Sequence, residues 1–256
     1  MSEIEWGRLR APELRALAAQ NAVVILPVGS IEQHGPHLPT QVDALLAGEI
    51  ARRAARKAAP ATPIVVAPTV WSGLAEHHMS LGATLSLDFE AFFALLRGLV
   101  RSLVRHGFGR VLLLNGHGGN VAALTVIANE LGVELKAPIA TATYWLLARD
   151  AYKAILQRQS TVRHACEAET SMLLALAPEL VDMRKAQDAV GPTARELDDV
   201  VGSDAAHRWR SFASRTSHGA IGDPRAATPE KGERLLDAAA EAVARLVTNQ
   251  EFWELR

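Results

Sequence analysis

The chain is 256 residues long and 49% hydrophobic, which is ample for a large core, and its 27 Lys and Arg residues nearly balance 28 Asp and Glu residues. This near neutrality, with aromatic residues at only 5%, argues against nucleic acid or an anionic membrane as a partner. The single cysteine, Cys166, the polar N-terminus and the lack of a membrane-length apolar run predict a soluble, cytoplasmic protein without a disulfide framework.

The first apolar segment, VVILPV at residues 23–28, follows a predicted helix at residues 11–20. It is short and β-branched, which predicts a strand buried on both faces. Glu32, His34 and Asp43 come in the loop after it, and such loops often carry the chemistry of α/β proteins. Carboxylate oxygens with imidazole nitrogens suit Zn²⁺, Mn²⁺ or Fe²⁺. On this stretch alone, a metal site and a polar surface loop with scattered histidines are about equally favoured.

Asp43 also precedes residues 44–59, whose alanine and arginine content predicts a helix. An aspartate at this place can serve simply as the N-cap of that helix. We favour metal ligation because Glu32 and His34 lie so close before it. Residues 64–67 then predict a second buried strand.

A polar insertion at residues 69–87 contains Glu76, His77 and His78. On an extended chain, adjacent histidines point to opposite faces, so at most one of the two is expected to face a site. We interpret the insertion as a rim of the active site or a subunit contact, not as a source of metal ligands. We assign His78 to substrate binding.

The second chemical stretch is the turn GHGGN, which ends a predicted strand at residues 110–114. Gly118 and Gly119 allow the backbone to approach a ligand closely, and we assign both to substrate binding. The turn lacks the pattern of a phosphate-binding loop. A ligand histidine at His117 is therefore favoured over a phosphate cradle or a histidine satisfied in the core.

The third chemical stretch is HACEAETS, which begins at His164. Residues 167–177 predict a helix, so Glu169 lies about one turn from its start. A first-turn acid often does no more than interact with the helix dipole. His164 can likewise be only a polar residue that flanks the helix.

The alternation of helix and buried-strand patterns predicts one domain over residues 1–256. It favours an α/β fold, a three-layer αβα sandwich around a mostly parallel sheet. Residues 181–222 are polar and broken, and a stretch this long is usually functional or covered by a partner. The further predicted elements are a helix at 87–106 with Asp88 as N-cap and Gly107 as stop, a helix at 120–131, a strand at 135–143, and a helix at 229–246 with Thr228 as N-cap.

Four motifs in this order, LPVGSIEQHGPHLPTQVD, NGHGGN, HACEAETS and GDPRAATPEKGE, resemble the creatininase family of metal-dependent amide hydrolases. The resemblance covers most of the chain, and the four motifs together are far more specific than any one alone. It implies a creatininase-like fold, a site for two divalent metal ions (Zn²⁺ and/or Mn²⁺, with Fe²⁺ as a further candidate) and a homo-oligomer, which in the family is a hexamer.

The resemblance also implies a role for each candidate ligand. Glu32 and His117 match ligands of one metal. His34 matches a ligand of the other metal, and Asp43 matches the carboxylate that bridges both.

One position departs from the relatives that hydrolyse creatinine. They tend to carry Asn-Gly-His-Tyr-Glu-Asn, with a ligand glutamate where this chain has Gly119, so we expect Glu169 to complete the shell of the second metal. The departure argues against creatinine itself as the substrate. His164 resembles the family's general acid/base histidine. Trp145, after the predicted strand, is a candidate for the mobile tryptophan that covers the substrate.

The expected function is metal-dependent hydrolysis of a C–N bond in a small, non-peptide, preferably cyclic amide, through a metal-bridging hydroxide. Within the family, the alternatives are a formamide deformylase and a peptidase that trims a peptide cofactor precursor. From a different class, a metal- or nucleotide-binding module without hydrolytic activity remains open.

Overall fold

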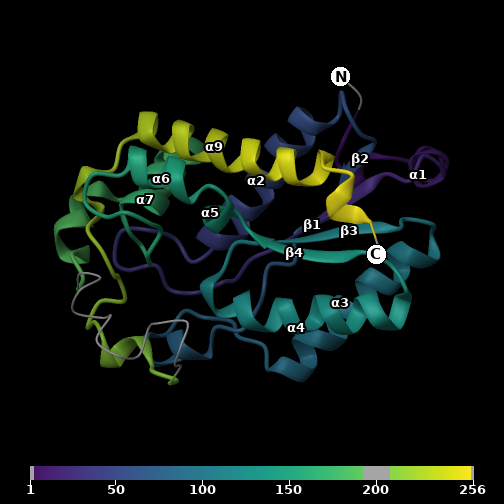
Figure 1. Cartoon of the computed structure of the whole chain (residues 1–256). Helices are drawn as coiled ribbons and strands as arrows, with labels where there is room; N and C mark the ends of the chain where they lie inside the picture. The colour runs from purple at the N-terminus through teal and green to yellow at the C-terminus, as the bar shows by residue number, and fades with distance from the viewer. Residues whose placement is uncertain (1–2, 193–207, 255–256) are drawn as a thin grey trace.

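A four-stranded parallel sheet lies at the centre of the computed structural model, which describes residues 3–192 and 208–254 (Figure 1). All pairings between its strands are parallel. The predicted α/β class is therefore confirmed. The strands, in the spatial order β2-β1-β3-β4, are β1 (Val23–Val28), β2 (Ile64–Val66), β3 (Arg110–Asn115) and β4 (Ile139–Thr143).

The register of the sheet places three loops side by side. Every residue of β1, β2 and β3 is buried, as mainly apolar strands covered on both faces should be. Val28, the last residue of β1, pairs with Asn115 of β3, which in turn pairs with Thr143 of β4. The segments that follow β1, β3 and β4 therefore leave the sheet at one level of its C-terminal edge.

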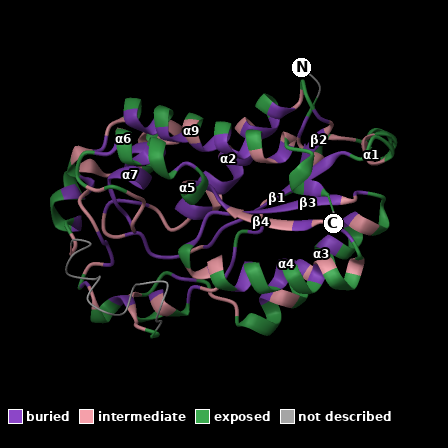
Figure 2. Cartoon of the chain, viewed as in Figure 1, coloured by how far each residue is buried: buried purple, intermediate pink, exposed green. Residues whose placement is uncertain are grey.

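Helices cover both faces of the sheet and complete the expected three layers (Figure 1). Successive residues of β1 point to opposite faces, so Val23 and Ile25 enter one core while Val24 and Leu26 enter the other. Buried residues accordingly line the sheet and the inner helix faces (Figure 2). One face carries α2 (Val42–Ala58), α5 (Tyr144–Leu147), α6 (Arg149–Ile155), α7 (Glu167–Leu176) and α9 (Pro229–Thr248), the other α3 (Phe89–Arg105) and α4 (Val121–Leu135), and α1 (Ala11–Ala19) packs near the N-terminus.

Three predicted helix ends are confirmed. The side chain of Asp88 accepts a hydrogen bond from the Ala91 amide at 2.7 Å, as an N-cap should. Thr228 caps α9 in the same way. Gly107 follows α3 with a φ of +92°, the left-handed conformation that glycine adopts without strain.

The predicted boundary between α4 and β4 is wrong. The helix continues through Gly132 to Leu135 and ends with Lys136 in a left-handed conformation, so the strand begins only at Ile139. One glycine costs a helix about 1 kcal/mol relative to alanine, and the burial of Leu131 in the core beneath α4 is enough to offset that cost.

Short 3₁₀ helices connect the main elements. Within the region that the sequence left without clear elements, two of them form at Met183–Ala189 and Phe212–Ser214, while residues 193–207 lie outside the described part of the chain. None of the described helices combines the length and apolarity needed to cross a membrane. The other 3₁₀ helices are Trp6–Arg8, Glu76–Leu81, Gly118–Asn120, Pro178–Leu180, Pro224–Ala226 and Glu251–Trp253.

Candidate metal centre

Five predicted ligands from four parts of the chain meet at the C-terminal edge of the sheet. Two follow β1, one lies in the first turn of α2, one follows β3 and one lies in the first turn of α7. The side chains offer three carboxylates and two imidazoles, and none of the five residues is more than 5% exposed. They are Glu32, His34, Asp43, His117 and Glu169.

Asp43 lies between the two histidines. Its Oδ1 is 3.2 Å from His34 Nε2, and its Oδ2 is 2.9 Å from His117 Nδ1. Glu32 Oε2 is 2.8 Å from the same nitrogen of His117. Two compact groups, Glu32–Asp43–His117 and His34–Asp43–Glu169, each have ligand atoms within 4.8 Å of one another. Asp43 belongs to both groups.

The N-cap interpretation of Asp43 is wrong, because the N-cap of α2 is Gln41. The Asp43 side chain turns towards the imidazoles instead. For Glu169, the interpretation as a first-turn acid holds in part. Its Oε2 accepts a hydrogen bond from the Ala165 amide at 2.6 Å, while the carboxylate also reaches His34 and Asp43.

The imidazoles are oriented as metal ligands usually are. His34 Nδ1 is 3.1 Å from the Glu32 carbonyl oxygen, and His117 Nε2 is 3.1 Å from the Leu74 carbonyl oxygen. A carbonyl can only accept, so each of these nitrogens carries a proton, and the other ring nitrogen faces the carboxylates. Holding the outer N–H of a histidine on a backbone carbonyl is the common arrangement around protein metals.

Among the described residues, two buried atoms of the cluster have an ion-pair partner but no well-aligned hydrogen bond. They are Glu32 Oε2, which faces His117, and His34 Nε2, which faces Asp43, and a buried polar atom that is not fully satisfied is costly. A cation among these oxygen and nitrogen donors would satisfy both atoms, and the donor set is one that Zn²⁺ and Mn²⁺ accept. The residues present therefore fit a divalent metal.

The pKa values show how the cluster balances its charge. Burial raises the pKa of Glu32 and raises that of Glu169 to about 8. Burial would also raise the pKa of Asp43, but the charge of His34 and the close contacts with both histidines lower it. Burial would lower the pKa of each histidine, yet the carboxylates outweigh it and raise the pKa of His34 to about 9 and that of His117 well above 6.5. Protons on the histidines thus offset the negative charge of the carboxylates, and a bound metal cation could take the place of these protons.

His164, the predicted acid/base residue, lies beside this cluster. Its Nε2 is 2.7 Å from the Gln33 carbonyl oxygen and so carries the proton. Its Nδ1 is 3.5 Å from Glu32 Oε1. Burial lowers the pKa of His164 well below 6.5, so the ring is neutral, and its free nitrogen faces the carboxylates. It also forms a possible ligand group with Glu32 and His34.

The expectation that only one of His77 and His78 could face the site is wrong. Residues Glu76–Leu81 form a 3₁₀ helix, not an extended strand, and both rings turn to the cluster. The His77 ring stacks on His117 with centroids 5.5 Å apart. His78 is 1% exposed, and its Nε2 lies 3.1 Å from Glu32 Oε1. The assignment of His78 to substrate binding stays a prediction, now with Glu32 as a neighbour.

The two glycines of the GHGGN turn differ in their surroundings. A Cβ at Gly118 would meet nothing within 4 Å, whereas a Cβ at Gly119 would lie 2.3 Å from the Leu74 carbonyl oxygen and 2.4 Å from His117 Nε2. No side chain fits at Gly119 without moving His117. Trp145 lies in α5, half-buried against the core under α9 and edge-on to Tyr144.

Three residues near the site were not predicted. The Gln33 amide nitrogen lies 2.8 Å from His78 Nδ1 and donates to the Gly219 carbonyl at 3.1 Å. The Phe212 ring stacks on His78 at 3.9 Å, and Arg215 lies over Phe212. Gln33 stands between two predicted ligands, a position that could have drawn attention to it. Phe212 and Arg215 lie in the polar, broken region and have no local signal.

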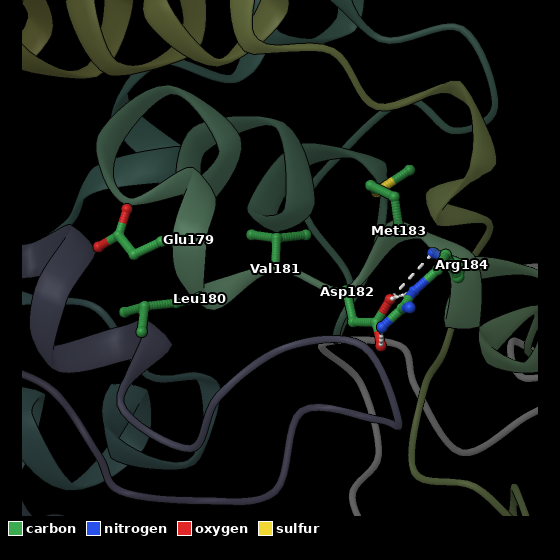
Figure 3. Close-up of a pocket in the computed structure, with 6 residues that line it drawn as sticks. All are labelled: Glu179, Leu180, Val181, Asp182, Met183 and Arg184. Atoms are coloured by element: carbon green, nitrogen blue, oxygen red, sulfur yellow. Dashed lines mark hydrogen bonds and ion pairs between the residues drawn. The ribbon is translucent and has the colours of Figure 1, made fainter.

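A surface hollow lies apart from this cluster. It has a volume of about 500 Å³ and is lined by residues 179–184 (Figure 3). Asp182 and Arg184 pair with each other at its edge. The Asp182 amide also donates to the His37 carbonyl, so the segment that lines the hollow is connected to the loop after β1. It brings together no group of potential metal ligands among the described residues.

Fold and site define the class: an αβα protein with a buried carboxylate–imidazole cluster at the C-terminal edge of a parallel sheet. Residues 7–247 match the family model for creatininase, described as creatinine amidohydrolase. The chain therefore belongs to the creatininase family of amidohydrolases, as its motifs indicated.

Two relatives show the range of activities in this family. The creatinine amidohydrolase of Pseudomonas putida is 28% identical over 271 residues, which cover 98% of this chain and 96% of that protein. The mycofactocin precursor peptide peptidase of Mycobacterium tuberculosis is 32% identical over 247 residues, 94% of this chain and 90% of that protein.

Solved structures agree with the fold over nearly the whole chain. A crystal structure of creatinine amidohydrolase has a TM-score of 0.84 at 26% identity and covers 98% of this chain and 99% of its own. A manganese form of creatininase (TM-score 0.80, 27% identity, 95% and 97% covered) and a mutant creatininase of Zn-Zn type (0.80, 26%, 96% and 97%) are similar to it as well.

Proposed function

We propose that this protein is an amidohydrolase that works with two divalent cations. The observation that carries the proposal is the position of Asp43, whose two carboxylate oxygens face different ligand groups. One cation would be held by Glu32, His117 and Asp43, the other by His34, Glu169 and Asp43. The manganese and Zn-Zn forms of similar creatininases support Mn²⁺ or Zn²⁺ as the metal.

When bound, such cations would acidify water and polarise a carbonyl group. The chain itself would manage the protons. His164 presents an unprotonated Nδ1 to the cluster while the Gln33 carbonyl holds its Nε2–H. It can therefore take a proton and deliver it to the departing nitrogen. Amide nitrogen is a poor leaving group, so this proton contributes roughly 10²–10⁴-fold in rate.

The surroundings of His164 would keep bulk water away. The Phe212 ring lies edge-on to the His164 ring at 4.8 Å and stacks on His78. Phe212 is buried, and His78 donates from its Nε2 towards Glu32. Apolar cover of this kind strengthens the electrostatic interactions inside a site.

The bond to be cleaved is an amide C–N bond. A small cyclic, non-peptide amide is our first candidate, because the creatinine-hydrolysing relative aligns over almost the whole chain. A peptide is the second, favoured by the peptidase relative and by Gly119, where there is no room for the glutamate that creatinine-hydrolysing relatives carry.

The test combines metal analysis with a substrate panel. Purified protein should contain close to two equivalents of metal and hydrolyse at least one member of a panel of creatinine, formamides and short peptides. Chelation should stop turnover, and Mn²⁺ or Zn²⁺ should restore it. A folded protein that binds metal but turns over no amide would favour the non-catalytic module instead.

We also propose that the protein forms a homo-oligomer in the cytoplasm, a hexamer by resemblance. Large apolar side chains on the 69–87 insertion support a subunit contact there, since Trp71 is 54% and Leu85 56% exposed. Light scattering on the purified protein tests this, and a monomer at micromolar concentration would contradict it.

A further inference from the structure

The segment after residue 207 returns to the histidine cluster. The 3₁₀ helix Phe212–Ser214 packs against the one at Glu76–Leu81. Its Phe212 ring contacts three imidazoles, with centroids 3.9 Å from His78, 4.8 Å from His164 and 5.6 Å from His77. Phe212 is 6% exposed. This segment therefore forms part of the site's wall.

Two arginines stand on this wall, and within residues 3–192 and 208–254 neither has a counter-ion. The Arg215 guanidinium lies over the Phe212 ring at 5.3 Å, and its Nη2 donates to the Arg210 carbonyl at 3.2 Å. The Nε atoms of Arg215 and Arg210 are both buried and have no hydrogen-bond partner in the described part of the chain. Among the residues that the structure describes, no carboxylate pairs with either guanidinium.

This arrangement is costly in the protein alone. A buried N–H without an acceptor loses its hydration, and two neighbouring guanidinium groups repel each other. Burial, followed by the charge of Arg210, lowers the pKa of Arg215. The carboxylates of the metal cluster are already engaged with histidines. A suitable partner for such a guanidinium is an anion with oxygen acceptors, which the guanidinium fork binds with two parallel hydrogen bonds.

Arg215 also lies close to the reaction centre. Its guanidinium is 5.3 Å from the centroid of the Phe212 ring, and that ring contacts His78 and His164. His77 stacks on the candidate ligand His117. An anion held by Arg215 would thus lie one ring away from the imidazoles, across Phe212, which is a suitable separation for another part of the same small substrate.

We propose that the substrate of this enzyme is an amide that also carries a carboxylate, and that Arg215 binds that carboxylate. The inference rests on the proposed amidohydrolase function and adds the substrate class: a cyclic or open-chain amide with a free carboxylate, of which an N-acyl amino acid or a short peptide is the simplest form. Arg215 is then a specificity-determining residue, and Arg210 supports it by adding positive charge. A neutral ring such as creatinine would leave the guanidinium unpaired.

Matched substrates test the proposal in the metal-loaded enzyme. N-acetylalanine and N-ethylacetamide share the amide and differ by the carboxylate, as do glycylalanine and glycine ethylamide. We expect kcat/KM to be at least about 10-fold higher for the carboxylate member of at least one pair, because hydrogen bonds to charged groups contribute more than neutral ones.

Variants then assign the preference to Arg215. Arg215→Met keeps much of the side chain's length without its charge, and it should lower kcat/KM for the carboxylate substrate about 10–100-fold, mainly through KM. For the analogue without a carboxylate, kcat/KM should change less than about twofold. Arg215→Lys should lose part of the preference, because an ammonium keeps the charge but not the fork. The control is Arg105→Met, at an exposed arginine of α3, which should leave kcat/KM unchanged for both substrates.

The outcomes separate this inference from the proposed function. If no amide is turned over with metal bound, the proposed function fails. If amides are hydrolysed but both members of each pair react equally, only the carboxylate proposal fails. The carboxylate proposal also fails if Arg215→Met slows hydrolysis of both members of a pair alike. It fails as well if the variant lowers the melting temperature and does not change the preference for the carboxylate substrate, since the guanidinium would then pair within the chain.

Discussion

At the scale of single residues, Asp43 has the largest expected effect. It is 3% exposed, and its two oxygens face His34 and His117. A carboxylate that serves two cations cannot be lost without affecting both. We expect Asp43→Ala to remove both metals or leave one weakly held, as measured by elemental analysis after gel filtration. Two retained equivalents would disprove the bridging role.

His164 and Glu169 lie close together but have different predicted roles. In Glu169→Gln, the amide oxygen can still accept from the Ala165 amide, while the negative charge is lost. We expect lower occupancy of one metal and partial rescue of activity by excess Mn²⁺ or Zn²⁺.

His164→Ala should instead keep both metals and lose roughly 10²-fold or more in turnover. The loss should shrink for amides with better leaving groups, which need less protonation. Circular dichroism should show that both variants are folded. If His164→Ala loses metal while Glu169→Gln keeps both, the two roles must be exchanged.

At the scale of elements, the close crossing of α7 and α9 holds Glu169 in place. A Cβ at Gly232 of α9 would lie 1.9 Å from the Ser171 carbonyl oxygen of α7, whereas a Cβ at Gly98 of α3 would meet nothing within 4 Å. A buried ion pair, Lys231 with Glu167 at 2.6 Å, joins the same two helices. Glycine here permits a contact between backbones that no other residue allows.

Because of this crossing, alanine substitutions at Gly232 and Gly98 should change the free energy of unfolding in opposite directions. Gly232→Ala should lower the free energy of unfolding by about 1–3 kcal/mol, because backbone atoms must separate. Gly98→Ala, at an exposed helical position, should raise it by roughly 0.5–1 kcal/mol. Urea unfolding of both variants measures the difference. Equal effects would mean that α9 shifts without strain.

At the scale of the whole molecule, metal should hold the four ligand-bearing segments together. Binding to the folded state alone stabilises it by about 2.7 kcal/mol when free metal is 100 times Kd. The pKa of His34 is raised to about 9 and that of His117 lies well above 6.5, so both hold protons at pH 7 without metal. A metal must displace those protons, and its affinity therefore rises with pH up to about pH 9.

We therefore expect chelation to lower Tm, and the Mn²⁺-dependent rise in Tm to be larger at pH 8 than at pH 6. Differential scanning fluorimetry measures both, and Asp43→Ala should show little rise at either pH. A rise that is larger at pH 6 would contradict the displacement of histidine protons.

Much of the fold and part of the site could be predicted from local sequence. β1 is an apolar run rich in β-branched residues and β3 contains the apolar run Val111–Leu114, and such runs become buried strands in most contexts. Asp88 and Thr228 cap their helices through hydrogen bonds to amides three residues away. The close spacing of Glu32 and His34 after a buried strand is likewise a local pattern with a chemical meaning.

Other features were decided only by tertiary structure. Glu169 reaches Asp43 because α7 and α2 pack on the same face of the sheet, and no local pattern encodes that distance. His77 and His78 both face the cluster because packing winds their segment into a 3₁₀ helix. Phe212 and Arg215 join the site from a region without periodicity. Local propensity depends on residues that are neighbours in the sequence. The positions of these side chains depend instead on the order of the strands in the sheet and on the packing of the loops, which involve residues far apart in the sequence.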